Sequence, residues 1–147
     1  MTEPVDPDAA SASGAPGLLA LLAVAVGGAM GTLSRYGISR MLPTVAASIP
    51  WSIFLVNVSG CLALGFVLQL VIERWPTNDY IRPFVAVGFI GAFTTFSTVM
   101  VDTDLLVRDG NAGTAAAYVI GSVIAGLVAV FTGIAIASRL RRTEPSC

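Results

Sequence analysis

The sequence predicts an all-α membrane protein with four transmembrane helices. Only 12% of its 147 residues are charged, about half the proportion of an ordinary soluble domain, and 55% are hydrophobic. Four stretches without any charged residue make up most of the chain: 9–34, 41–72, 83–101 and 110–138. Each can supply the roughly 20 apolar residues that cross a bilayer. No sustained alternation of polar and apolar residues supports a β-barrel, so helices are expected.

These proportions exclude a soluble enzyme, a nucleic-acid binder and a disordered tail protein. The formal net charge is −1, and all eight basic residues are arginine. Histidine, the commonest acid–base side chain and metal ligand, does not occur in the sequence. The two cysteines, Cys61 and Cys147, have no metal-binding spacing, and we interpret them as a packing residue and a tail residue.

Residues 1–17 predict a disordered leader, because they are rich in Pro, Ala, Ser and acidic residues. A secretory signal begins with positive charge, whereas this segment contains Glu3, Asp6 and Asp8 and no arginine. We therefore expect no cleavage and a retained first helix. The four-helix transmembrane domain is predicted over 18–139, followed by a polar C-terminal tail over 140–147.

The first span is predicted at about 18–41, where Gly27 and Gly31 have the small-residue spacing that lets helix backbones approach closely in lipid. Two prolines in 43–50 predict a linker. The second span, at about 51–72, opens with Trp51, a residue typical of the membrane interface.

A polar turn over 73–79 precedes a third span at about 83–108 and a fourth at about 112–138. Four spans place both termini and this turn on one side of the membrane. That side carries five arginines and the other side three, a small excess that favours a cytoplasmic location for both termini.

Hydroxyl side chains cluster in the middle of the third span, at Thr94, Thr95, Ser97 and Thr98, shortly after two glycines, Gly88 and Gly91. Such residues compete for backbone hydrogen bonds, so we expect the third helix to be broken mid-membrane. Broken helices at this depth occur where the backbone faces protein or water, and their freed carbonyls can bind a cation. The alternative is ordinary helix packing through Ser and Thr.

Two other spans carry polar side chains. Asn57 lies within the second span, and its amide has two hydrogens that suit an anion. Tyr118, Ser122 and Gly126 are spaced four residues apart in the fourth span and share one helix face. For both groups, contact between neighbouring helices is the alternative to a polar pathway.

Three motifs occur in a characteristic order: Gly27-Gly28-x-x-Gly31-x-x-x-Arg35-Tyr36; Val56-Asn57-x-x-Gly60 followed by Gly65; and Gly88-Phe-x-Gly91-x-x-Thr94-Thr95-Phe96-Ser97-Thr98. Together they resemble the fluoride-channel family, called Fluc or CrcB, over essentially all of 18–139. The third motif is the most specific of the three.

The resemblance implies a dual-topology dimer of two antiparallel subunits with two pores in the plasma membrane. It implies passive export of fluoride, which reduces fluoride toxicity in the cytoplasm. The implied pore residues are Asn57, Phe96, Ser97, Thr98, Tyr118 and Ser122, with Arg35 lining a vestibule. Backbone carbonyls of Gly91 and Thr94 correspond to those that hold a central sodium ion at the dimer interface.

Donors of this kind suit a small, tightly hydrated anion, which loses its water in a narrow pore. Asn amides, hydroxyls and the positive edges of aromatic rings can replace that water. A fixed positive charge at Arg35, or a buried sodium ion, lowers the barrier further in a low dielectric.

The sequence departs from the family pattern at two positions. Val99 stands where the family has its second pore phenylalanine, and Gly126 stands where a hydroxyl is usual. These changes suggest the hypothesis that the chain pairs with an oppositely oriented homologue that supplies one intact pore, instead of forming a homodimer. Asp102 occupies an acidic position of the family and is expected near a pore mouth.

Two other functions remain open from the residues. A proton-coupled small multidrug exporter is also a small antiparallel dimer of four-helix subunits, but it needs an acid in its first helix, and none lies between Asp8 and Glu73. A non-conducting structural partner subunit explains the hydrophobicity but not the polar residues within the spans.

Overall fold

The computed structural model describes residues 17–42, 48–74 and 80–142, and these residues are almost entirely helical. Four helical segments are long and apolar enough to cross a membrane, which confirms the predicted all-α membrane fold. The leader expected at 1–17 lies outside the described residues except for Gly17. Most of the expected 73–79 turn, and the expected tail from 143 onward, also lie outside them.

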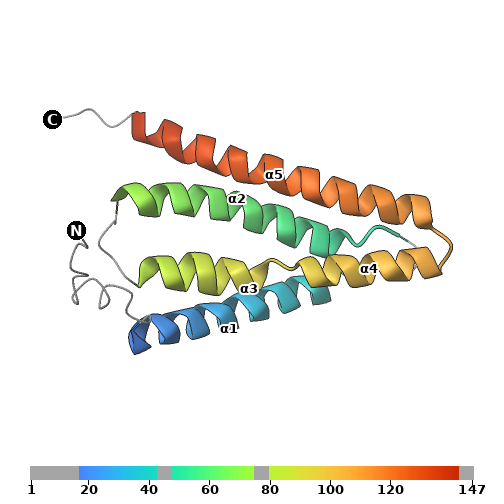
Figure 1. Cartoon of the computed structure of the whole chain (residues 1–147), viewed down its shortest axis with the longest axis horizontal. Coiled ribbons are helices and arrows are strands. Elements are labelled where there is room, and N and C mark those ends of the chain that lie inside the picture. The colour runs from blue at the N-terminus through green and yellow to red at the C-terminus, as the bar shows by residue number, and fades with distance from the viewer. Residues whose placement is uncertain (1–16, 43–47, 75–79, 143–147) are drawn as a thin grey trace, which may run out of the picture.

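The first two spans are single helices, and the third is built from several segments. The order of elements is α1 (Leu18–Met41), α2 (Trp51–Arg74), the π-helix η2 (Pro83–Ile90), α3 (Gly91–Phe93), α4 (Phe96–Arg108) and α5 (Ala112–Arg142). α5 continues past 138 into the first three residues of the expected tail. The chain alternates in direction, so α1 begins at the end of the molecule where α5 finishes (Figure 1).

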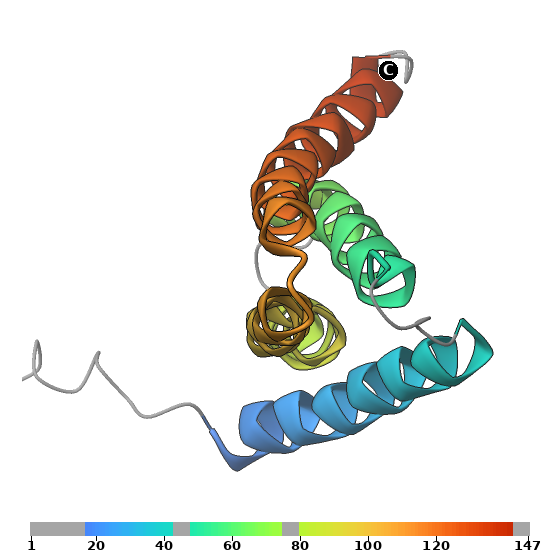
Figure 2. The same cartoon turned by 90° about the vertical axis from the view of Figure 1, so that its right-hand side faces the viewer.

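The third span lies at the centre of the arrangement. α1 packs against η2 and α3, and α4 contacts α5. The most extensive contact between two helices is that of α2 with α5. Viewed along the helices, α1 crosses one side of the central span and the α2–α5 pair covers another (Figure 2). The central span is therefore in contact with α1, α2 and α5 alike.

Glycines allow two of these helix pairs to touch through their backbones. A Cβ at Gly27 or Gly31 of α1 would collide with the carbonyl oxygens of Phe84 or Phe89 on η2. At the α2–α5 contact, a Cβ at Gly133 would collide with the carbonyl oxygen of Leu62. The small-residue spacing predicted in α1 thus serves close packing of helices, as it does in other membrane proteins.

Few large side chains are buried. The buried core cluster consists of Ile53, Val99, Leu106, Ala115 and Tyr118, near the α4–α5 turn. In the most apolar windows of α1 and α5, only 11% of residues are buried within the chain. Most of the apolar surface therefore faces outward, where lipid or another protein subunit must cover it.

We expect Gly31→Ala to destabilise the fold by about 1–3 kcal/mol, the usual penalty for overpacking. The added methyl group would meet the Phe89 backbone, which cannot move aside as a side chain can. Thermal unfolding of the purified protein in detergent measures the effect. Gly28→Ala is the matched control, since its Cβ would meet no atom closer than 3.9 Å. Equal unfolding midpoints for the two variants would contradict the packing described here.

Candidate functional site

The central span is interrupted between α3 and α4. Thr94, with φ −79° and ψ 152°, and Thr95, with φ −150° and ψ 121°, are both extended. Thr95 caps α4, because its Oγ1 accepts a hydrogen bond of 3.2 Å from the N–H of Thr98. The interruption falls within the hydroxyl cluster, and its extended backbone groups need partners other than those of a helix.

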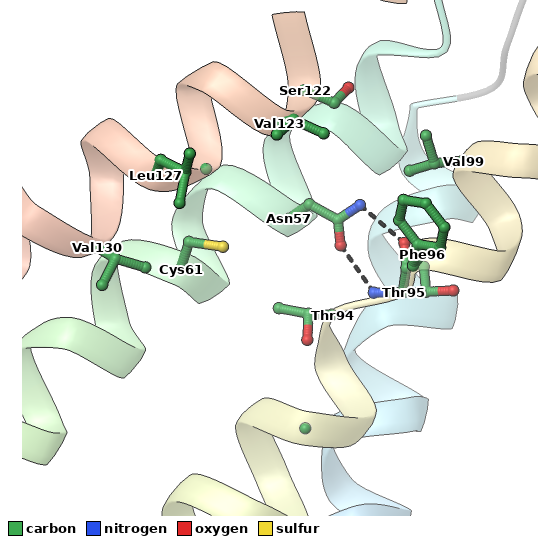
Figure 3. A pocket seen from close by; sticks show the side chains of 12 residues that line it. Asn57, Cys61, Thr94, Thr95, Phe96, Val99, Ser122, Val123, Leu127 and Val130 are labelled. Atoms are coloured by element: carbon green, nitrogen blue, oxygen red, sulfur yellow. Dashed lines mark hydrogen bonds between the residues drawn. The ribbon is translucent and has the colours of Figure 1, made fainter. Parts of the chain in front are cut away.

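Asn57 of α2 supplies those partners. Its Oδ1 accepts a hydrogen bond of 2.7 Å from the Thr95 N–H, and its Nδ2 donates one of 2.9 Å to the Thr95 carbonyl (Figure 3). The amide therefore holds both backbone groups of one extended residue. One Nδ2 hydrogen is used in this way, and the second makes no hydrogen bond with any described residue.

A network of hydroxyls surrounds Thr95. Its Oγ1 lies 3.2 Å from Ser97 Oγ and 3.0 Å from Thr98 Oγ1, both within hydrogen-bond distance. Arg35 of α1 donates from Nη1 to Thr98 Oγ1 at 3.5 Å, while its buried Nε has no partner among the described residues. The cationic side chain of α1 thus reaches the first turn of α4, where the helix dipole is also positive.

A cavity of about 470 Å³ lies between α2, the interruption and α5, and opens to the surface. Its lining combines polar and apolar side chains: Asn57, Cys61, Gly91, Thr94, Thr95, Phe96, Val99, Ser122, Val123, Gly126, Leu127 and Val130. Phe96 is 66% exposed, so its ring stands at the open side and not in the core of the chain. The Asn57 amide and the Phe96 ring lie close to the same edge of the cavity (Figure 3).

Three buried polar atoms near the start of α5 have no hydrogen-bond partner among the described residues. They are Asp102 Oδ2, the Tyr118 hydroxyl and Ser122 Oγ. Asp102 and Tyr118 lie close enough across the α4–α5 contact for the hydroxyl and the carboxylate to interact, although the geometry falls short of a well-formed hydrogen bond. Buried polar atoms are almost always paired in proteins, so these groups are candidates for binding an ion or water.

The interruption also frees backbone carbonyls. In a continuous helix, the N–H groups of Thr95 and Thr98 would donate to the carbonyls of Gly91 and Thr94. Here the Thr95 N–H donates to Asn57 and the Thr98 N–H donates to the Thr95 hydroxyl. Carbonyl oxygens at unwound helix segments are the ligands that sodium takes in membrane proteins. The carbonyls of Gly91 and Thr94, which the family resemblance implies as sodium ligands, thus lack their usual helical donors.

The structure brings the predicted residues together in two neighbouring groups. Asn57, Phe96, Ser122, Gly91 and Thr94 line the cavity. Arg35, Ser97 and Thr98 belong to the hydroxyl network around Thr95. Tyr118 is separate from both groups, since it is 2% exposed and lies in the core cluster.

Two residues of the site were not predicted as site residues, although Thr95 was named in the hydroxyl cluster and in the third motif. Thr95 is the centre of both the Asn57 contact and the hydroxyl network, and its place directly before a helix start was the available signal. Cys61, which we interpreted as a packing residue, is a free thiol that lines the cavity. Its signal was its position one helical turn beyond Asn57.

Comparison with known proteins assigns the chain to a family. The family described as CrcB-like protein, Camphor Resistance (CrcB), matches residues 22–134. The chain is 50% identical over 116 residues to the fluoride-specific ion channel FluC 3 of Streptomyces avermitilis, a match that covers 79% of this chain and 57% of that protein. It is 44% identical over 113 residues to FluC 2 of Nocardia farcinica, covering 77% of this chain and 81% of the relative.

A third relative, the fluoride-specific ion channel FluC 1 of Mycolicibacterium paratuberculosis, is 40% identical over 121 residues, which is 82% of this chain and 92% of that protein. All three relatives are named as ion channels, not as enzymes. The apolar spans and these relatives identify a multi-pass protein of the plasma membrane. The family match and the identities together show that the chain belongs to the CrcB family of membrane proteins.

Proposed function

We propose that this chain is a subunit of a fluoride-selective ion channel, which lets fluoride leave the cytoplasm passively and so lowers its toxicity. The relatives named as fluoride-specific channels support the choice of ion. The observation that carries the proposal is the interrupted central span, where Asn57 and a hydroxyl network supply hydrogen-bond donors beside a cavity.

The donors at this site suit an anion that has lost its water. The second Nδ2 hydrogen of Asn57 and the buried hydroxyl of Ser122 are neutral donors without a partner among the described residues, and both residues line the cavity. Phe96 adds a ring whose edge carries positive charge density. In a low dielectric, such fixed groups replace the hydration shell without having to reorganise as the ion passes.

The remaining residues act from either side of these donors. Arg35 is the fixed positive charge of a vestibule, and through Thr98 it is connected to the start of α4. Ser97 and Thr98 present hydroxyls next to Phe96, and Tyr118 continues the polar face of α5 beyond Ser122. In this proposal, the interruption lies in the middle of the bilayer, where it opens one helix to the ion path.

The channel in this proposal is a dual-topology dimer with two antiparallel subunits and two pores. The cavity opens to the surface of the single chain, and Phe96 is largely exposed at its opening. A second subunit would close this side and complete each pore. Five arginines on one side and three on the other form a small bias that permits either orientation in the membrane.

We further propose that the carbonyls of Gly91 and Thr94 hold a structural sodium ion at the dimer interface. Both carbonyls have lost their usual helical donors, because Asn57 and the Thr95 hydroxyl bind those N–H groups instead. The bound cation supplies positive charge that stabilises the interruption and favours an anion nearby.

Val99 and Gly126 lead us to propose a partner that is a homologue and not a second copy. Both residues line the cavity but offer neither a ring edge nor a hydroxyl. An oppositely oriented homologue with both groups would provide one complete pore. A drug exporter lacks its acid here, since no Asp or Glu lies between Asp8 and Glu73.

Liposome efflux recorded with fluoride and chloride electrodes tests the channel function, and Asn57→Asp tests the site. The protein should release fluoride and not chloride. The Asn57→Asp variant should slow fluoride release at least tenfold, about 1.4 kcal/mol on the barrier, because a carboxylate repels the anion and cannot donate to the Thr95 carbonyl.

Ser59→Ala is the control for this variant. Ser59 lies on the same helix, but its Oγ donates only to the Val56 carbonyl of α2, at 3.1 Å, so release should be unchanged. Undiminished release by Asn57→Asp would remove Asn57 from the pore. Drug-driven proton uptake without fluoride release would support an exporter, and neither activity would support a non-conducting partner.

Replacing sodium with N-methylglucamine tests the proposed cation site. An ion that binds only the folded protein stabilises it, so the midpoint temperature of unfolding should fall when sodium is removed. Fluoride release should slow in the same buffers. An organic cation of equal charge keeps the ionic strength constant and is too large for carbonyl ligation. Identical midpoints and rates in both buffers would overturn the sodium site.

Expression with and without a homologue tests the proposed pairing. The chain alone should release fluoride more slowly than the chain co-expressed with an oppositely oriented homologue that has a phenylalanine at the position of Val99. Pull-down through a tag on one chain identifies mixed dimers. Full fluoride release by the chain alone would refute the need for a different partner.

A further inference from the structure

Polar residues that line the cavity come from both α5 and α2. On α5, Ser122 lines the cavity, but the residue one turn later is Gly126, which has no side chain. On α2, Cys61 lies one turn beyond Asn57 and lines the same cavity. A Cβ at Gly126 would lie 3.4 Å from Cys61 Sγ, so the thiol faces the space that a side chain at 126 would occupy.

Cys61 offers a weakly polar side chain opposite an apolar stretch of the α5 lining. Beyond Ser122, the cavity wall of α5 consists of Val123, Gly126, Leu127 and Val130. The thiol is half-buried and free, and Figure 3 shows it extending from α2 on the side of the helix that carries Asn57. On the other side of Gly126, Ser122 Oγ is a buried donor without a partner among the described residues.

We propose that Cys61 is a further ion-contacting residue, whose S–H donates to fluoride where α5 presents only Gly126. This inference rests on the proposed fluoride pathway. A thiol can donate a hydrogen bond and carries no fixed charge, so it can assist passage of the ion. The polar wall thus runs from Ser122 on α5 to Cys61 on α2 instead of continuing along one helix.

Thiol modification in liposomes tests the position of Cys61 independently of conduction. The starting protein carries Cys147→Ser, since Cys147 is the only other cysteine. A water-soluble methanethiosulfonate reagent should form a mixed disulfide with Cys61 and release sulfinate. Fluoride should slow this modification, and chloride should not.

The matched control places a thiol on the neighbouring face of the same helix. Leu62→Cys, combined with Cys61→Ser and Cys147→Ser, puts it at a residue that is 39% exposed and does not line the cavity. This thiol should react more slowly, without an effect of fluoride. Failure of Cys61 to react, or reaction that fluoride does not slow, would overturn the inference.

Fluoride release tests the contribution of the thiol. Cys61→Ala should slow release about fivefold, the effect of about 1 kcal/mol for a lost donor. Cys61→Ser should keep release near the starting rate, and Gly126→Ser should restore it in the Cys61→Ala background. Unchanged release by Cys61→Ala would overturn the inference. If the starting protein releases no fluoride either alone or with the homologue, the proposed function fails, while thiol modification still decides the placement of Cys61.

Discussion

The pair of hydrogen bonds between Asn57 and Thr95 is the interaction on which the site depends. A membrane interior provides no water for exposed backbone groups, and each unpaired group costs several kcal/mol. Two extended residues between α3 and α4 have given up their helical partners, and in such an environment other groups must replace those partners. One amide does this for both the N–H and the carbonyl of Thr95, at 2.7 and 2.9 Å.

Several features of the site follow from this interaction. Because the Thr95 N–H turns to Asn57, the Gly91 carbonyl loses its helical donor. Because Thr95 is extended, its hydroxyl caps α4 and collects the hydroxyls of Ser97 and Thr98. The first residue of α4, Phe96, then stands at the open side of the cavity. The same contact that stabilises the interruption therefore arranges the polar groups around it.

Asn57 reaches Thr95 because glycines bring the helices close together. A Cβ at Gly60, one turn after Asn57 on α2, would meet Thr94. On the other side of α2, Gly133 of α5 lies against the carbonyl of Leu62. α2 is therefore held between the interruption and α5 by contacts that leave no room for larger residues. The apolar side chains of α1 and α5 turn outward, and the buried polar atoms of Tyr118 and Ser122 are left without partners within the described chain.

The amino-acid sequence by itself determined the four spans, because the preference of a helix for lipid depends on the composition of each stretch. From clustered Thr and Ser residues, which compete for backbone hydrogen bonds, the sequence also predicted a break in the third helix. In the structure, Thr94 and Thr95 have extended backbone between α3 and α4. The sequence left open whether Asn57 contacts a neighbouring helix or an ion. Only the tertiary structure decided that Thr95 is its partner, that Tyr118 is in the core, and that Cys61 lines the cavity. These contacts join residues that are far apart in the chain. They depend on how closely the helices pack and on their register, and a local sequence pattern contains neither.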